Sequence, residues 1–143
     1  MKSMMRILAV VVCVAAMTAA CNKAANEPGA TSGAAGVRVT EMDLGRSIGA
    51  DKGIADKTTE FRPSDTVYLS VETDGTGPQA TLQTRWTFQD GQVVNESSQT
   101  IAPTGKARTE FHIVNPGGLP AGKYEVAVSV NGAAAGTKNF EVK

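Results

Sequence analysis

Hydrophobic side chains recur at every second position over most of the chain after residue 66, and this period predicts β-strands with one buried face. The clearest run places Tyr124, Val126 and Val128 on one face, between polar or small neighbours. Another run places Trp86 and Phe88 on a common face. Further inward sets are Val67, Leu69 and Val71, then Thr109, Phe111 and Ile113, then Phe140 and Val142. The centre of the expected core is Trp86, Phe88, Phe111, Tyr124, Val126 and Val128.

Turn residues separate these runs. Asp90-Gly91 and Asn131-Gly132 are dipeptides typical of tight hairpin turns. A longer corner, rich in Gly and Pro, spans residues 115–122. We count about seven strands and no amphipathic helix. Short strands at this spacing predict an all-β fold, either a sandwich or a barrel.

Three stretches are less regular. Residues 37–44 predict an edge strand with a bulge, because the apolar alternation slips between Val39 and Met42. Residues 45–63 are polar and turn-rich, and they predict a long connection that holds a short extra strand. Residues 92–101 are rich in Ser and Thr, which places this strand near an edge of its sheet.

The register of that last strand depends on the length of the turn at Asp90-Gly91. A shift by one residue exchanges the two faces of a strand. The sequence therefore leaves two alternatives open, in which either Val93 or Val94 faces Trp86 and Phe88.

The sandwich is favoured by the segment 119–124, Leu-Pro-Ala-Gly-Lys-Tyr. This segment resembles the E–F corner of immunoglobulin-like and fibronectin type III domains, where a Tyr at the start of strand F hydrogen-bonds back to the corner. Trp86 stands where such domains often keep a buried Trp. The resemblance covers about residues 66–142 and implies a single immunoglobulin-like sandwich of antiparallel strands. The Cys pair of antibody domains is absent from the sequence, so an antibody-type domain is not expected.

The N-terminus has the pattern of a secretory leader. Lys2 and Arg6 precede an apolar run over residues 7–16, and small residues follow. This order of basic, apolar and small residues defines a signal peptide. The apolar run is shorter than the roughly 20 residues that a membrane-spanning helix needs.

Residues 18–21, Thr-Ala-Ala-Cys, resemble a bacterial lipobox, although that family prefers Leu where Thr18 stands. The resemblance implies that the thiol of Cys21 carries a diacylglycerol and that Cys21 becomes the new N-terminus. The alternative is ordinary cleavage after Ala20, which leaves a free thiol. Asn22, rather than Asp, follows the Cys and implies sorting to the outer membrane, facing the periplasm, as in enteric bacteria.

The chain is therefore expected to have three parts. Residues 1–20 are a lipoprotein signal peptide. Residues 21–36 are the lipidated Cys and a flexible tether, because the stretch after the Cys has no large apolar side chain to bury. Residues 37–143 are the sandwich domain, and the leader with Phe61-x-Pro63-x-Asp65 also looks like small bacterial envelope lipoproteins.

Charge and cysteine content limit the kinds of ligand and partner that the domain is expected to bind. Removing Lys2 and Arg6 from 14 basic residues leaves 12 against 14 acidic residues, a net charge of −2. Nucleic acid is not an expected partner, because binding it requires a basic surface. Cys13 is removed with the leader, so the domain has no disulfide and no thiolate metal site. We expect no cofactor and no metal.

Candidates for chemistry are few. His112 is the single His, and it lies between Phe111 and Ile113, so the alternation points it outward. A catalytic set with Ser97 or Ser98 is not demanded by the spacing, and an exposed strand residue is the favoured interpretation. Asp51, Asp56 and Glu60 share the 45–63 connection, where solvated carboxylates are favoured over a weak calcium site.

Tyr68 and Arg85 are predicted to point outward from two strands, and both residue types are enriched at binding hot spots. They are the candidate binding residues, together with loops 45–63 and 74–79. We expect a lipid-anchored, monomeric envelope protein without catalytic activity, whose domain binds another envelope protein or a glycan. The alternative is an inhibitor or accessory protein of an envelope hydrolase that acts through residues 45–63.

Overall fold

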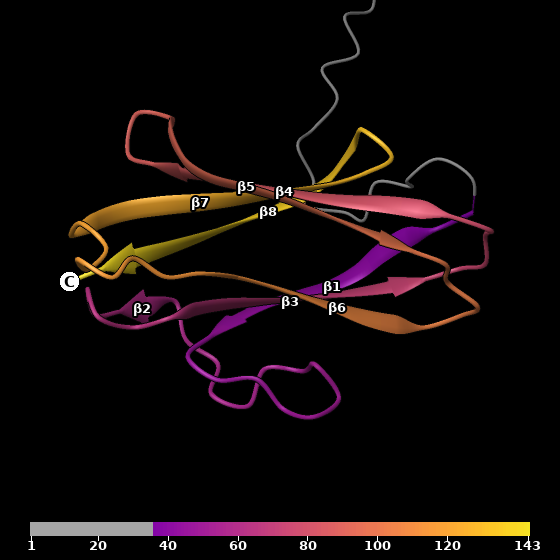
Figure 1. Ribbon diagram of the computed structural model, residues 1–143, viewed down its shortest axis with the longest axis horizontal. Helices are drawn as coiled ribbons and strands as arrows, with labels where there is room; N and C mark the ends of the chain where they lie inside the picture. The colour runs from indigo at the N-terminus through magenta and orange to yellow at the C-terminus, as the bar shows by residue number, and fades with distance from the viewer. Residues whose placement is uncertain (1–35) are drawn as a thin grey trace, which may run out of the picture.

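A computed structural model describes residues 36–143, which form eight β-strands in two sheets (Figure 1). The strands are β1 (Arg38–Gly45), β2 (Glu60–Phe61), β3 (Val67–Asp74), β4 (Ala80–Phe88), β5 (Gln92–Ile101), β6 (Ala107–Ile113), β7 (Gly122–Val130) and β8 (Ala133–Val142). The smaller sheet has the order β1-β3-β6, and the larger has the order β2-β8-β7-β4-β5. The expected all-β sandwich is therefore confirmed, with β2 as the short extra strand of the 45–63 connection.

The core lies between the two layers and uses the inward faces that the sequence pattern predicts. Trp86, Val126 and Val128 are at most 1% exposed, and Phe111 and Tyr124 are also buried. Phe140 joins Phe61, Trp86 and Tyr124 in one aromatic cluster, with ring centroids 5.0–5.9 Å from its own. Phe88 is only half-buried and packs against the margin of this core, beside the ring of Tyr124.

The corner before β7 has the expected hydrogen bond. The hydroxyl of Tyr124 donates to the carbonyl oxygen of Pro120 at 2.8 Å. Burial raises the pKa of the Tyr124 phenol, so the group stays a neutral donor. Gly122 has a φ of 147°, and a Cβ there would lie 2.7 Å from the ring of Phe88. Only Gly fits this position, which explains the Gly two residues before the Tyr.

The edge strand β1 carries the expected irregularity. Its register against β3 shifts between Val39 and Glu41, so that Thr40 is the extra residue of a bulge. The bulge keeps Val39 and Met42 on the buried face despite their uneven spacing.

The connection after β1 is folded rather than irregular. Isolated bridges pair Gly45 with Lys57 and Ile48 with Ile54, so residues 45–57 form a small hairpin. At its tip the amide of Gly49 donates to the carbonyl of Gly53 at 2.7 Å. In Figure 1 this hairpin lies on the far side of the three-stranded sheet from the core.

The pairing of β4 with β5 departs from both alternatives left open by the sequence. Asn95 lies opposite Trp86, Gln92 lies opposite Phe88, and the register shifts between them, so Val94 is the extra residue of a bulge. Val93 and Val94 are 39% and 40% exposed, and neither packs into the core. The expectation was wrong because a bulge falls at this pair of residues, which places Val93 opposite Thr87 and leaves Val94 without a residue opposite it on β4.

No helix occurs among residues 36–143, so that part of the chain contains no helical segment able to cross a membrane. The expected signal peptide, Cys21 and the expected tether up to residue 35 lie outside the described residues.

Candidate functional site

A shallow trough runs across the outer face of the five-stranded sheet. It has a volume of about 460 Å³ and is open to solvent. Strands β4, β5, β7 and β8 all contribute to its lining, which consists of Gln83, Thr84, Arg85, Glu96, Ser97, Ser98, Ala127, Val128, Ser129, Gly132 and Ala134. The floor of the trough is formed by small residues of β7 and β8, such as Ala127, Ser129 and Ala134, and the longer side chains of Gln83, Arg85 and Glu96 lie beside them.

The lining offers neutral hydrogen-bonding groups with one charged pair. Ser98 and Gln83 lie directly opposite each other on β5 and β4, and Ser129 lies opposite Gln83 on β7. The guanidinium of Arg85 and the carboxylate of Glu96 are 3.4 Å apart and neutralise each other at the surface. A surface of hydroxyl and amide groups around small apolar residues suits a neutral polar ligand better than an ionic one.

The two residues singled out from the sequence do not share a surface. Arg85 is exposed and lines the trough. Tyr68 is on β3 of the other sheet, so the two side chains project from opposite faces of the sandwich. The alternation correctly predicted that both point outward, but it carries no information on which sheet each strand joins.

Tyr68 lies beside His112. Their ring centroids are 5.6 Å apart, and the Nδ1 atom of His112 lies 2.5 Å from the carboxylate of Glu110. His112 is exposed, as expected, with 52% of its side-chain surface accessible. Ser97 and Ser98 belong to β5 of the other sheet, and the structure does not bring them to His112.

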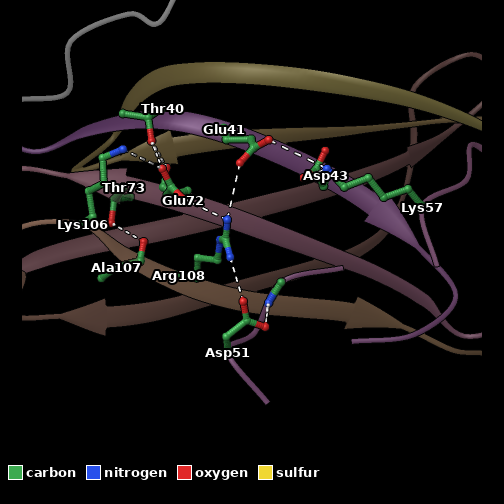
Figure 2. A network of polar contacts seen from close by, with 11 residues as sticks. Thr40, Glu41, Asp43, Asp51, Lys57, Glu72, Thr73, Lys106, Ala107 and Arg108 are labelled. Atoms are coloured by element: carbon green, nitrogen blue, oxygen red, sulfur yellow. Dashed lines mark hydrogen bonds and ion pairs between the residues drawn. The ribbon is translucent and has the colours of Figure 1, made fainter. Parts of the chain in front are cut away.

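The outer face of the three-stranded sheet carries a network of ion pairs (Figure 2). Arg108 of β6 is its centre and reaches Asp51 at 2.9 Å, Glu72 at 3.1 Å and Glu41 at 3.7 Å. Lys57 lies 2.7 Å from Asp43, and this hydrogen bond raises the pKa of the Lys57 ammonium. Because Asp51 and Lys57 belong to the 45–57 hairpin, the network attaches that hairpin to the sheet.

The three carboxylates considered as a calcium site are not brought together. Asp51 binds Arg108, Asp56 lies 3.6 Å from Arg46, and Glu60 accepts a hydrogen bond from Lys143 at 2.7 Å. The Lys143 contact lowers the pKa of the Glu60 carboxyl. Within residues 36–143, no group of three or more His, Cys, Asp or Glu side chains is arranged to hold a metal ion.

Sequence reasoning did not find the trough. Its lining residues come from four strands that are separated by up to 51 positions along the chain, from Gln83 to Ala134. The available signal was a run of small residues over 127–136, together with the Ser-rich strand 92–101. Small residues at outward positions are also common on strands without a ligand, so the run was not diagnostic.

Comparison with known proteins gives a fold. No family model matches the chain, and no curated protein matches it. An immunoglobulin-like protein from Pseudomonas aeruginosa matches with a TM-score of 0.50 and 16% identity, over 76% of this chain and 98% of that chain. A segment of the Pseudomonas fluorescens alkylpurine DNA glycosylase AlkC, solved bound to DNA, matches with a TM-score of 0.50 and 17% identity, over 76% of this chain and 31% of that chain.

The described residues are thus an immunoglobulin-like β-sandwich. The sheet order, the Tyr124 corner and the match over nearly the whole length of the Pseudomonas aeruginosa protein agree on this class. The chain spans about a third of the length of the glycosylase, which places a domain of this shape within a larger enzyme. A domain of this class is consistent with an interaction module.

Proposed function

We propose that this protein is a lipid-anchored, non-catalytic recognition module of the bacterial cell envelope, and that the trough on the five-stranded sheet is its binding surface. The observation behind this proposal is the trough itself. Residues of four strands line one solvent-open depression of about 460 Å³ that presents hydroxyl and amide groups. Its base is formed by hydrogen-bonded strands of the five-stranded sheet, which hold the lining groups in fixed positions.

The expected ligand is a glycan or a polar segment of another envelope protein. Ser98, Gln83 and Ser129 form a row of donors and acceptors across three strands. Such a row matches the hydroxyl groups of a sugar or the amides of an extended peptide. The opposite charges of Arg85 and Glu96 neutralise each other, so the row offers no net charge to an ionic ligand.

The anchor and the absence of catalysis are supported by the sequence and by the surroundings of His112. The lipobox-like residues 18–21 and the tether 22–36 would hold the domain at a membrane within about 20 Å, the reach of a flexible chain of that length. His112 contacts Glu110 and Tyr68, whereas Ser97 and Ser98 belong to the other sheet.

The test places a photoreactive side chain at Gln83 in the full chain, within the envelope of the producing cell. A matched variant carries the same group at Tyr68, on the opposite face of the sandwich. We expect covalent adducts from position 83 at several times the yield from position 68. Equal yields, or adducts from position 68 alone, would reject the trough.

A filling variant gives the same test without crosslinking. Ala134→Tyr adds a large side chain to the lining at an exposed position, and Asn139→Tyr adds it on the same strand outside the lining. Ala134→Tyr should weaken capture of the adduct partner by tenfold or more, whereas Asn139→Tyr should leave it unchanged.

A second candidate is the inhibitor or accessory role through residues 45–63. The observation that favours it is the order of the 45–57 hairpin, which is held by backbone bonds and by the Arg108–Asp51 pair. A rigid protruding hairpin has the shape that a hydrolase cleft accepts. Deleting residues 49–53 should abolish inhibition of an envelope hydrolase under this role and should leave adducts at position 83 unaffected.

A further inference from the structure

Strand β5 leaves one edge of the five-stranded sheet open. It pairs with β4 alone, although it is ten residues long. All of its residues are exposed except Ser97 and Ile101, which are half-buried. Among residues 36–143, no strand neighbours the backbone groups on this edge, and such an edge is a template for pairing with another chain.

The other edges in the described part of the chain carry features that prevent pairing. Strand β1 is bulged, and its outer face is covered by ion pairs to Lys57. Strand β2 has only two residues. Strand β6 follows Lys106 and carries the charged side chains of Arg108 and Glu110. The backbone carbonyl of Glu110 already accepts a hydrogen bond from the side chain of Gln99 at 2.6 Å. Charges, bulges and short length are the usual protections of an edge.

Strand β5 lacks these protections over residues 95–101. Its ladder with β4 is regular there, because the bulge at Val94 precedes this segment. The segment contains no Lys, Arg or Pro, and its single charge, on Glu96, is paired with Arg85 of the same chain.

We propose that β5 pairs with β5 of a second copy, antiparallel and about a twofold axis at Ser98. A twofold axis perpendicular to a sheet requires one residue to lie opposite itself. Ser98 is the midpoint of the regular segment 95–101, so this register gives a seven-residue ladder without a bulge. An axis at Ser97 or Gln99 shortens the regular ladder, and an axis at Glu96 places two carboxylates opposite each other.

The proposed register is also complementary in its side chains. Glu96 lies opposite Thr100 of the second copy, so no like charges meet. Asn95 lies opposite Ile101, and beyond the ladder the exposed Val94 approaches Ala102, which is also exposed. The proposed dimer differs from the monomer that the sequence led us to expect.

The pairing has a consequence for the trough. A twofold axis perpendicular to the sheet keeps the outer faces of both copies on one side. Glu96 and Ser98 line the trough at its β5 end, so the troughs of the two copies would meet along the paired strands. A single groove would cross both sheets, which suits an extended ligand such as a glycan strand.

The test is disulfide crosslinking of the full chain in its envelope with a mild added oxidant. Ser98→Cys places two thiols opposite each other, within the Cα separation of 4.4–6.8 Å that a disulfide needs. Thr100→Cys is the matched control on the same face of the same strand, because its two copies are four residue steps apart, about 14 Å. The unaltered chain gives the baseline for Cys13 and Cys21.

We expect Ser98→Cys to crosslink at least fivefold more than Thr100→Cys. Coexpressed Glu96→Cys and Thr100→Cys chains with tags of different length should crosslink to each other and not to themselves. Equal crosslinking of Ser98→Cys and Thr100→Cys, or crosslinking at the level of the unaltered chain, would overturn the proposal.

A second measurement does not depend on disulfide chemistry. Ser98→Lys places two ammonium groups on the axis, at an exposed position that tolerates Lys. Sedimentation of the full chain in detergent should show a dimer for the unaltered chain and for Asn139→Lys, and at least tenfold weaker association for Ser98→Lys. If the unaltered chain and both variants sediment as monomers, the proposed dimer is wrong. The proposed binding at the trough is then tested separately, by the photocrosslinking from position 83.

Discussion

At the residue scale, the corner hydroxyl of Tyr124 makes a measurable contribution. Tyr124→Phe removes the donor to the Pro120 carbonyl and leaves the ring in place. We expect a loss of about 1 kcal/mol in the free energy of unfolding, the usual value of a partly buried hydrogen bond. Denaturant titration measures it, and Tyr68→Phe, whose contact is between rings, is the matched control with a change near zero.

Gly45 tests the attachment of the hairpin to β1. A Cβ at this position would lie 2.2 Å from both the Asp56 carbonyl oxygen and the Ile54 side chain. Gly45→Ala should therefore destabilise the domain by about 1–3 kcal/mol, the cost of overpacking a close contact. Gly117→Ala is the control, because its nearest neighbour is 3.7 Å away and the change should be neutral in thermal unfolding.

At the element scale, Arg108 is predicted to fix the tip of the 45–57 hairpin. Arg108→Met removes the contacts to Asp51, Glu72 and Glu41 but keeps an apolar stem. Global stability should change by less than about 1 kcal/mol, because the pairs are partly exposed.

Amide hydrogen exchange of Gly49 and Gly53 at the hairpin tip should nevertheless accelerate several-fold, and salt should have the same effect on the unaltered chain. Arg38→Met, which removes only the pair with Asp74, is the control with unchanged exchange at the tip. Unchanged exchange in Arg108→Met would show that the backbone bonds hold the hairpin alone.

The turn between β2 and β3 is expected to make the stability of the domain depend on pH. The carboxylate of Asp65 accepts the amide of Arg62 at 2.9 Å and Nε of Arg46 at 3.0 Å. These contacts, the backbone bond foremost, lower the pKa of the Asp65 carboxyl in the folded state. A lowered folded-state pKa gives stability that is present above the unfolded pKa, about 3.9, and is lost as the pH falls through the folded value.

Asp65→Asn should therefore cost about 1 kcal/mol at pH 7. The difference from the unaltered chain should shrink steadily below pH 3.9 as the native carboxylate is protonated. Denaturant titrations at pH 7, 4 and 2.5 measure it. A difference that does not depend on pH would mean that the charge of Asp65 is irrelevant to the turn.

At the scale of the whole molecule, attachment to the membrane is predicted to depend on one atom, the Sγ of Cys21. Cys21→Ser removes the acylation site, and each buried CH₂ of an acyl chain is worth about 0.8 kcal/mol of membrane affinity. The variant should lose acyl label and leave the membrane fraction. If it still sediments with membranes, and the unaltered chain takes up no acyl label, the lipoprotein interpretation is wrong.

The strands of the fold were predictable because each core strand has its own period of two. Strand β7 can be predicted from the alternation of Tyr124, Val126 and Val128 alone, without reference to its neighbouring strands. The register of β5 was not predictable, since Val93 and Val94 are both apolar and the sequence does not show that a bulge falls between them and Asn95. The trough was not predictable either, because its lining comes together only when β4, β5, β7 and β8 are arranged side by side.

The 45–57 hairpin illustrates the same limit. Its tip contacts Arg108, which lies 57 positions after Asp51, and no local pattern in a polar, Gly-containing segment indicates such a partner. The sequence did show that Tyr68, Arg85 and His112 point outward, because that follows from alternation alone.

The position of Phe140 has a consequence for biosynthesis. Its ring touches Phe61, Trp86 and Tyr124, so the aromatic cluster is incomplete until β8 has been made. Synthesis proceeds from the N-terminus, and the ribosome tunnel delays the last strand further. The aromatic side chains of the earlier strands therefore lack their contact with Phe140 until β8 emerges. A chain exported as proposed would stay unfolded long enough to be threaded through a translocation channel.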